Sequence, residues 1–383
     1  MTLSDLDLGD PRFRTSADVL DEMAAACASN PDLAQFETIG ESEEGRPIAG
    51  VTLGFGPRLV TLVAGAHADE PVGPETLRTL VLEGLAARGW GAEGGGVEDL
   101  WERFTFRIVP HVNPDAEARN QAWITRWRED DLEATLRAYL RHRQREAPGR
   151  DVEFGYPDLR VENRAATAFL FDGTPPALHM SLHGMGYSEG ALLLIEKGWA
   201  DRPVAKAVWQ GFLDAAARVG LRPHDHDRDA EKGFRYLGPG AWTTPEGRAM
   251  TQHFLALDDP ETAAQFRLSS MEQAMEAGTG ASPLCLVTEL PLFHLAADSD
   301  SEPGVPELLL RFRERQPELA AAALAGRELA PWVRDLGMRV VPLRDAMRVQ
   351  LRTIELALEA VLASGPPDPG LEGDEPGGHG SIR

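Results

Sequence analysis

The chain contains little lysine and an excess of acidic residues. Only three of its 38 basic residues are lysines (Lys197, Lys206 and Lys232), and its 61 Asp and Glu residues give a formal net charge of −23. Nucleic acids and anionic membranes bind proteins through basic surfaces. The composition therefore predicts that neither is a partner of this protein.

Cysteines are also few, and long apolar segments are absent. Cys27 and Cys285 are the only cysteines, too few for a disulfide framework or for a sulfur-rich structural zinc site. The acidic start MTLSDLDLGD lacks the basic and apolar regions of a signal peptide. No apolar run approaches the roughly 18 residues that a membrane span needs. We therefore expect a cytoplasmic protein.

Apolar segments that alternate with helical ones are the main structural signal. Hydrophobic residues make up 43% of the 383 residues, which is enough for a sizeable core. The spacing of Leu77, Leu80, Val81 and Leu85 predicts a helix over residues 71–89. Strands are expected at residues 46–54, 58–67, 104–113, 177–184, 190–198 and 283–290. This alternation predicts an α/β fold with a mixed, mostly parallel sheet sandwiched by helices.

The domain organisation expected from the sequence is one domain over residues 1–364. Its core would span about residues 38–295, and two or three further helices would follow at about residues 306–364. Residues 365–383, GPPDPGLEGDEPGGHGSIR, have the composition of a disordered tail, because they offer few apolar side chains to a core.

A candidate metal site begins in AGAHADEPVG, residues 64–73, where a buried strand gives way to a helix. His67 and Glu70 are three positions apart there, so a tight turn lets both face one centre, and both are good zinc ligands. His183 ends the predicted strand ALHMSLHG, and strand ends at one edge of an α/β sheet are where ligands gather. Two histidines and one glutamate leave a coordination position open for water, as in a catalytic zinc site.

Further motifs, taken in order, resemble the zinc carboxypeptidase family of metallopeptidases. The matches are GRPI at 45–48, the His67–Glu70 pair, NPDA at 113–116, Arg128 fifteen positions after Asn113, the Asn163–Arg164 pair, SLHG at 181–184 and VTELP at 287–291. Each motif alone is weak, but the ordered set extends over about residues 38–295. The resemblance implies a carboxypeptidase-like fold, one zinc ion and a peptide or peptide-like substrate.

The resemblance also implies a role for the residues of the metal site. His67, Glu70 and His183 would hold zinc, which lowers the pKa of a bound water to near 7. Glu289, in the apolar strand LCLVTEL, would take the proton of this water as the general base.

Three other matches imply contacts with the substrate. Arg128 would stabilise the oxyanion of the transition state. Asn163 and Arg164 would bind the terminal carboxylate of a peptide, because a guanidinium matches a carboxylate with two hydrogen bonds. The family commonly continues this pair with Asn and an aromatic residue, whereas this chain has Ala165 and Ala166.

These observations support one main function and leave two alternatives open. The main hypothesis is hydrolysis of a peptide amide bond at the C-terminal end. The second is a zinc amidase or deacylase that acts on cell-wall peptides or N-acyl amino acids. Asp69, immediately before Glu70, matches the murein-amidase and deacylase branches of the family. The other alternative is a relative that binds peptides without catalysis.

Overall fold

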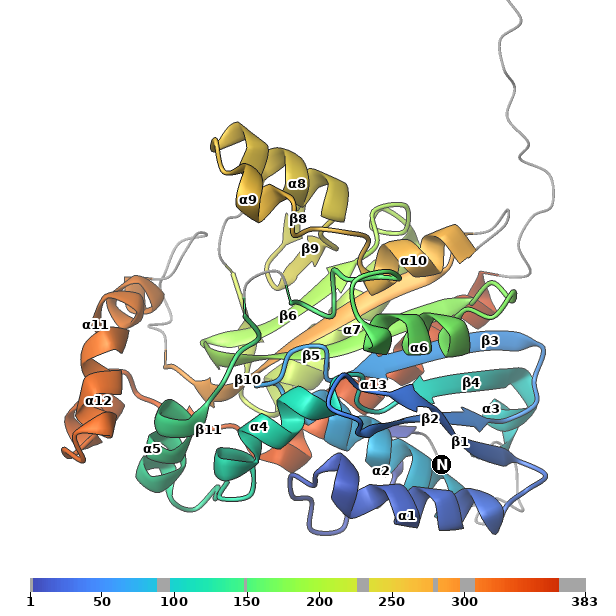
Figure 1. Ribbon diagram of the computed structural model, residues 1–383, viewed down its shortest axis with the longest axis horizontal. Coiled ribbons are helices and arrows are strands. Elements are labelled where there is room, and N and C mark those ends of the chain that lie inside the picture. Colours follow the sequence, from blue (N-terminus) through green and yellow to red (C-terminus); the bar gives the residue numbers. More distant parts are fainter. Residues whose placement is uncertain are drawn as a thin grey trace, which may run out of the picture.

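The computed structural model describes residues 3–87, 97–147, 150–225, 234–277, 282–296 and 307–364. Its strands are β1 Ala34–Glu41, β2 Pro47–Leu53, β3 Arg58–Ala64, β4 Phe104–Val109, β5 Leu178–Ser188, β6 Gly190–Ile195, β7 Arg222–Pro223, β8 Tyr236–Gly238, β9 Ala241–Thr243, β10 Leu284–His294 and β11 Arg339–Val340. All of them join one sheet in the order β1-β2-β4-β3-β5-β10-β6-β9-β8, with β11 on β10 and β7 on β6 (Figure 1).

The helices cover both faces of this sheet. They are η1 Leu3–Asp5, α1 Ser16–Ala28, α2 Val72–Ala86, α3 Val97–Arg103, α4 Pro114–Ile124, α5 Leu132–His142, α6 Val161–Leu170, α7 Pro203–Arg218, α8 Gly247–Ala256, α9 Pro260–Ala263, α10 Ser270–Ala277, α11 Glu307–Leu324, α12 Ala330–Asp335 and α13 Leu343–Ala363. Helices α2, α7 and α13 pack on one face, and α6 and α10 pack on the other. The predicted α/β fold, with its sheet between helices, is confirmed.

The centre of the sheet explains the sequence pattern. Strands β4, β3, β5 and β10 run parallel, and most of the outer pairs are antiparallel. A parallel strand covered on both faces needs apolar side chains on both, so β3 is buried almost throughout its sequence RLVTLVA. The edge strand β1, whose sequence AQFETIGE is mostly polar, was not expected from the sequence, because its apolar side chains are too few to mark it.

The register of the parallel strands positions the candidate site. Strand β3 ends at Ala64, which pairs with Leu182 of β5, so His183 is the first residue of β5 beyond that end. On the other side of β5, Glu289 of β10 pairs with His183. The end of β3, His183 and Glu289 therefore meet at one place in the middle of the sheet.

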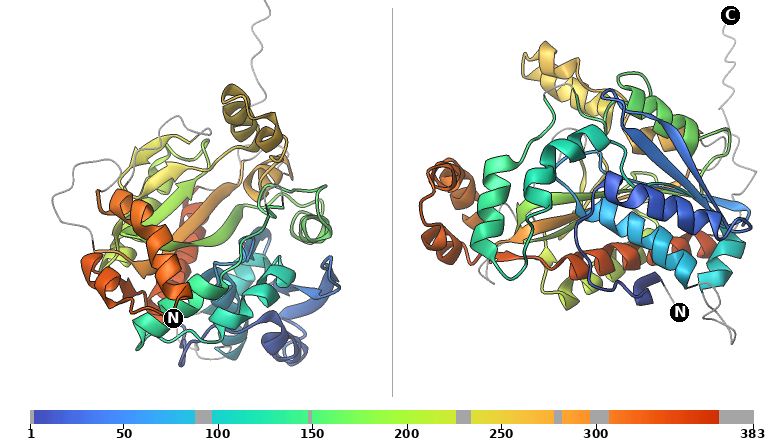
Figure 2. Two further views of the ribbon diagram at one scale, coloured as in Figure 1. Left: turned by 60° about the vertical axis from the view of Figure 1, so that its left-hand side comes forward. Right: turned by 60° about the horizontal axis from the view of Figure 1, so that its bottom comes forward.

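Helices α11 and α12 lie together beside α5 (Figure 2). Arg137 and Arg141 of α5 donate hydrogen bonds to backbone carbonyls at the end of α11, including those of Ala323 and Leu324. Cationic side chains are favourable there, because the last carbonyls of a helix lack partners within the helix. These bonds fasten α11 to α5. The predicted disordered tail, residues 365–383, lies outside the described residues.

The length and hydropathy of the helices were compared with those of a membrane span in the described ranges. Within them, none is both long and apolar enough to span a bilayer.

Candidate metal centre

The three candidate ligands converge on one point. His67 and Glu70 lie in the turn between β3 and α2, and His183 lies on β5. His67 Nδ1 is 3.0 Å from His183 Nδ1 and 3.0 Å from Glu70 Oε1, and His183 Nδ1 is 3.2 Å from Glu70 Oε2. A tetrahedral zinc ion with bonds of about 2.0–2.1 Å keeps its ligand atoms about 3.3 Å apart. Both the separations and the chemistry of the donors therefore fit zinc.

Small residues make this convergence possible. Gly65 directly follows β3 with φ at +75°, and a Cβ atom there would lie 2.4 Å from His111 Nδ1. Gly73, in the first turn of α2, brings that helix against β5, where an added Cβ would lie 2.3 Å from the carbonyl oxygen of Leu182. The backbone N–H of Gly184 donates to Glu70 Oε2 at 3.1 Å. The turn that carries His67 and Glu70 is therefore pressed directly onto the strand that carries His183.

Two carboxylates face the outer nitrogens of the histidines. Asp151 Oδ2 lies 3.6 Å from His67 Nε2, and Glu153 Oε2 lies 3.3 Å from His183 Nε2. Histidines that bind a metal usually offer their second ring nitrogen to such a carboxylate, which orients the ring. Sequence reasoning missed both residues, because they belong to a segment with no apolar periodicity and no motif that matched.

The charges around the histidines favour their protonated forms. Burial lowers the pKa of His183, but Glu153 and Glu70 outweigh it and raise this pKa to about 10. Burial likewise opposes protonation of His67, while Glu70 and Asp151 raise its pKa well above the ordinary value. A cation is thus strongly favoured at this point, and a divalent metal ion would displace the protons.

Glu289 lies beside the three candidate ligands, and its two carboxylate oxygens differ in their contacts. Its Oε2 is buried and has no hydrogen-bond partner among the described residues. Burial and then the negative charge of Glu70 raise the pKa of Glu289 to about 8. A buried carboxylate oxygen without a partner is costly. The arrangement therefore indicates that Glu289 meets a ligand, a water or a substrate.

Three cavities surround the metal group. The arginine cavity, of about 340 Å³, is lined by Glu70, Glu289, Arg143, Arg145 and Arg313 among others. The second cavity, of about 400 Å³, lies on the side of His67 and is lined by Asp151, Arg145, Glu146 and Phe266 among others. The apolar cavity, of about 190 Å³, is lined by His67, His183, Glu289, Glu153, Phe154, Leu194, Phe234, Met250, Met271 and Val287 among others. Each of the three cavities is lined by at least one of His67, Glu70 and His183.

Arg128 is not brought to this centre. Its side chain is 61% exposed and pairs with Asp130 at 3.2 Å, in the connection between α4 and α5. It lines a separate cavity that contains none of the three candidate ligands. Arg145, whose side chain is 67% exposed, lines both the arginine cavity and the second cavity and donates to Asp69 Oδ2 at 3.2 Å. Arg143 and Arg313 also line the arginine cavity. Arg128 precedes α5, whereas Arg145 follows it, so the structure brings Arg145 and not Arg128 to the cavities around the metal group.

Asn163 and Arg164 also lie away from the metal group. Both are on α6, where the side chain of Arg164 is exposed. Asn163 is buried, and its Nδ2 donates to the carbonyl of Val152 at 2.6 Å. Neither residue lines any of the three cavities. Asn163 instead supports the segment that carries Asp151 and Glu153.

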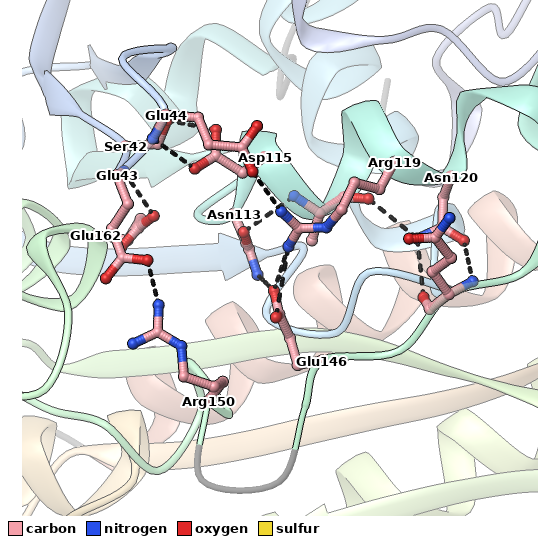
Figure 3. A network of polar contacts seen from close by, with 12 residues as sticks. Ser42, Glu43, Glu44, Asn113, Asp115, Arg119, Asn120, Glu146, Arg150 and Glu162 are labelled. Atoms are coloured by element: carbon pink, nitrogen blue, oxygen red, sulfur yellow. Dashed lines mark hydrogen bonds and ion pairs between the residues drawn. The ribbon is translucent and has the colours of Figure 1, made fainter.

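A polar network holds the segment that carries Arg145. Glu146, the next residue, accepts hydrogen bonds from Asn113 at 2.5 Å and from Arg119 at 3.2 Å (Figure 3). The buried Arg160 adds a third bond to Glu146 at 3.2 Å and pairs with Glu162 at 2.7 Å. Charge-assisted bonds of this kind are the strong ones. They fix the chain on both sides of residues 148–149, next to the metal group.

The sequence comparisons point to one family. Residues 19–185 match the model of a family described as zinc carboxypeptidase. Two curated relatives carry the name inactive metallocarboxypeptidase ECM14. The one from Ajellomyces capsulatus (strain H143) is 29% identical over 113 residues, which is 28% of this chain and 18% of the relative. The one from Ajellomyces dermatitidis (strain ER-3) is 27% identical over 113 residues, or 28% of this chain and 19% of the relative. The chain thus spans less than a fifth of the length of these relatives.

Solved structures of carboxypeptidases are similar at low identity. Bovine thrombin-activatable fibrinolysis inhibitor, in complex with tick carboxypeptidase inhibitor, is 13% identical with a TM-score of 0.47, over 92% of this chain and 98% of that one. Carboxypeptidase A from Helicoverpa armigera is 14% identical with a TM-score of 0.49, over 92% of this chain and 74% of that one. The family match in sequence includes His67, Glu70 and His183, whereas Glu289 lies beyond it. Residues 19–185 of this chain are thus similar to the zinc carboxypeptidase family.

Proposed function

We propose that this protein is a zinc-dependent hydrolase that cleaves an amide bond of a peptide or peptide-like substrate. The observation that carries the proposal is the unpartnered oxygen of Glu289 beside three convergent ligands. His67, Glu70 and His183 would hold the ion, which when bound acidifies a water molecule and polarises a carbonyl.

Glu289 is the general base in this proposal. Its pKa, raised to about 8 by burial and by Glu70, falls when positive charge is added nearby, so the carboxylate form is available near neutral pH. Glu289 takes the proton of the attacking water and then passes it to the nitrogen of the leaving amine. Its place in both the arginine cavity and the apolar cavity gives it access to the two sides of the bond that breaks.

Arg145, rather than Arg128, is our candidate for stabilising the oxyanion. It lines two cavities together with Glu70, and its guanidinium is held by the buried Asp69. A permanent positive charge at this position offsets the negative charge that develops on the carbonyl oxygen. Arg128 has no such access from its separate cavity.

The second candidate function is an amidase or deacylase, and one observation favours it. A carboxypeptidase needs a cation that binds the terminal carboxylate of its substrate. Arg164, the residue expected in that role, is exposed on α6 and lines none of the three cavities. An enzyme that does not read a free chain end has no need of such a residue.

A non-catalytic role is the third candidate, because the names of the curated relatives say inactive. Against it stand the three convergent ligands and Glu289, since a protein that only binds peptides needs no general base.

The test combines metal analysis with substrate screening. The purified chain should hold about one equivalent of zinc, or gain it on zinc addition. It should also release products from a library of peptides and N-acyl amino acids, read by mass spectrometry. Glu289→Gln should keep the metal and lose activity by about a thousandfold or more. The matched control is Glu37→Gln, a neutralised exposed glutamate on β1. Products that persist in Glu289→Gln, or less than about half an equivalent of metal with no gain on zinc addition, would show that the proposal is wrong.

A further inference from the structure

Gln350 is a buried amide on the last described helix, α13, and it lies against the elements that carry the metal group. Helix α13 lies beside α2 (Figure 2) and also packs on β5 and β10. The side chain of Gln350 is fully buried, and the proposed reaction makes no use of it. Burying a polar side chain is costly unless its hydrogen-bonding groups have partners. The partners of this amide therefore show what it holds in place.

Both polar atoms of the Gln350 amide have partners, and these lie on three different elements. Oε1 accepts a hydrogen bond from the hydroxyl of Thr76 on α2 at 2.6 Å. Nε2 donates to the backbone carbonyl of His183 on β5 at 3.3 Å and to the hydroxyl of Thr288 on β10 at 3.2 Å. A side-chain amide offers two N–H donors, and both are used here. One side chain thus ties α2, β5 and β10 together.

These partners also decide which way the amide of Gln350 points. The carbonyl oxygen of His183 can only accept a hydrogen bond, so the amide nitrogen must face it. The reverse orientation would place the amide oxygen against that carbonyl oxygen, and two acceptors repel. The hydroxyl of Thr76 satisfies the amide oxygen on the opposite side. The side chain therefore has one favourable arrangement between the three elements.

The three bonds act on the chain close to the metal group. His183 is itself a candidate ligand, and Thr288 directly precedes Glu289 on β10. Successive side chains of a strand point to opposite faces, so a Thr288 side chain held toward α13 directs Glu289 to the other face. Thr76 lies in the second turn of α2, the helix that follows Glu70. Loss of the amide would thus free β5 and β10 to shift relative to the turn that carries Glu70.

We propose that Gln350 is a positioning residue for the metal group. Its amide sets the placement of His183 relative to Glu289 and to the turn with His67 and Glu70. The inference rests on the proposed hydrolase function, because it assumes that Glu289 acts on a water at the metal. Misplacement of a catalytic group by about 1 Å can cost about 100-fold in rate. Bonds that hold a ligand and the general base together are therefore expected to matter more for the reaction than for folding.

The test removes the amide and measures the metal site directly. Gln350→Met keeps the length of the side chain and abolishes its hydrogen bonds. In the full-length chain loaded with cobalt, whose visible absorption depends on the ligand geometry, this variant should change the spectrum. It should also weaken zinc binding about tenfold in competition with a chelator. With a substrate from the library screen, kcat should fall about 10- to 100-fold while KM stays within about twofold.

Thr353→Val is the matched control for loss of a buried polar group from the same helix. Thr353 is fully buried on α13, and its hydroxyl donates within the helix, to the carbonyl of Val349 at 2.7 Å. This variant should leave the cobalt spectrum, the zinc affinity and kcat unchanged. A change equal to that of Gln350→Met would mean that α13 acts only through general stability, and the inference would be wrong.

A second pair of variants decides the question if Gln350→Met fails to fold. Thr288→Val removes the hydroxyl that accepts from the amide, whereas Thr288→Ser keeps it. The valine variant should change the cobalt spectrum, and the serine variant should restore it. An unchanged spectrum in both Gln350→Met and Thr288→Val, or an unchanged kcat in an active Gln350→Met, would overturn the inference. If the spectrum changes as expected but the unsubstituted chain hydrolyses no amide, the positioning of the metal group stands and the hydrolase proposal falls.

Discussion

The affinity of the centre for zinc should depend steeply on pH. Carboxylates around His183 raise its pKa to about 10, so at pH 7 the imidazole holds a proton that a metal must displace. A pKa about three units above the ambient pH corresponds to roughly 4 kcal/mol of metal-binding free energy at pH 7. His67, whose pKa is also raised, adds to this effect.

The sign and size of the effect follow from this competition. Protons oppose the metal, so affinity should rise with pH, by at least about tenfold per unit and thus about 100-fold between pH 6 and pH 8. The increase should continue until the pH reaches the pKa of the metal-free histidine, and then level off.

Two assays measure the prediction. Competition with a chromophoric chelator gives the zinc affinity at each pH, with the chelator's own pH dependence measured separately. Calorimetry in two buffers of different ionisation enthalpy gives the number of protons released, which should lie between one and two at pH 7. A change in zinc affinity of less than about tenfold between pH 6 and pH 8, or release of no proton, would refute the reasoning. Either result would mean that no protonated histidine loses its proton to bind the metal.

Four further outcomes are expected. Arg145→Gln should lower kcat/KM by about 100- to 1,000-fold, while Arg128→Gln should stay within about twofold; the reverse result would restore the assignment made from sequence. Glu153→Gln should weaken zinc binding about 10- to 100-fold by chelator competition, since it removes the carboxylate that faces a ligand histidine, and an unchanged affinity would show that the carboxylate does not orient that ring. Gly73→Ala should destabilise the fold by about 1–3 kcal/mol in urea unfolding, because the new methyl group meets a β5 carbonyl at 2.3 Å; a neutral result would mean that α2 can shift. Arg164→Ala should leave product release unchanged, because the side chain is exposed on α6; a large loss would favour the carboxypeptidase over the amidase.

The local pattern of the sequence was sufficient to predict the central strands. Apolar runs marked β3 and β10, alternation marked β5, and the spacing of apolar residues marked α2. The pair His67 and Glu70 was visible because both residues lie in one short turn. His183 and Glu289 were visible because each lies on a central, strongly apolar strand, and strands of that kind pair side by side.

The remaining parts of the site depend on long-range packing. Arg145, Asp151 and Glu153 lie in an irregular segment. Its path is set at Glu146 by a hydrogen bond from Asn113 and by ion pairs with Arg119 and Arg160, and no local periodicity records those contacts. The sequence match of Asn163 and Arg164 carries no information on their direction, and α6 leaves Arg164 exposed and Asn163 buried.

The arginine cavity shows most clearly the difference between what local sequence patterns predict and what long-range packing decides. Arg143 and Arg313 are 170 positions apart, and they face one cavity because α11 is fastened to α5. Hydrophobic periodicity determines where strands and helices form, since it depends on neighbours in the sequence. Which side chains meet between those elements is decided by packing and charge in three dimensions, and only the tertiary structure supplies that information.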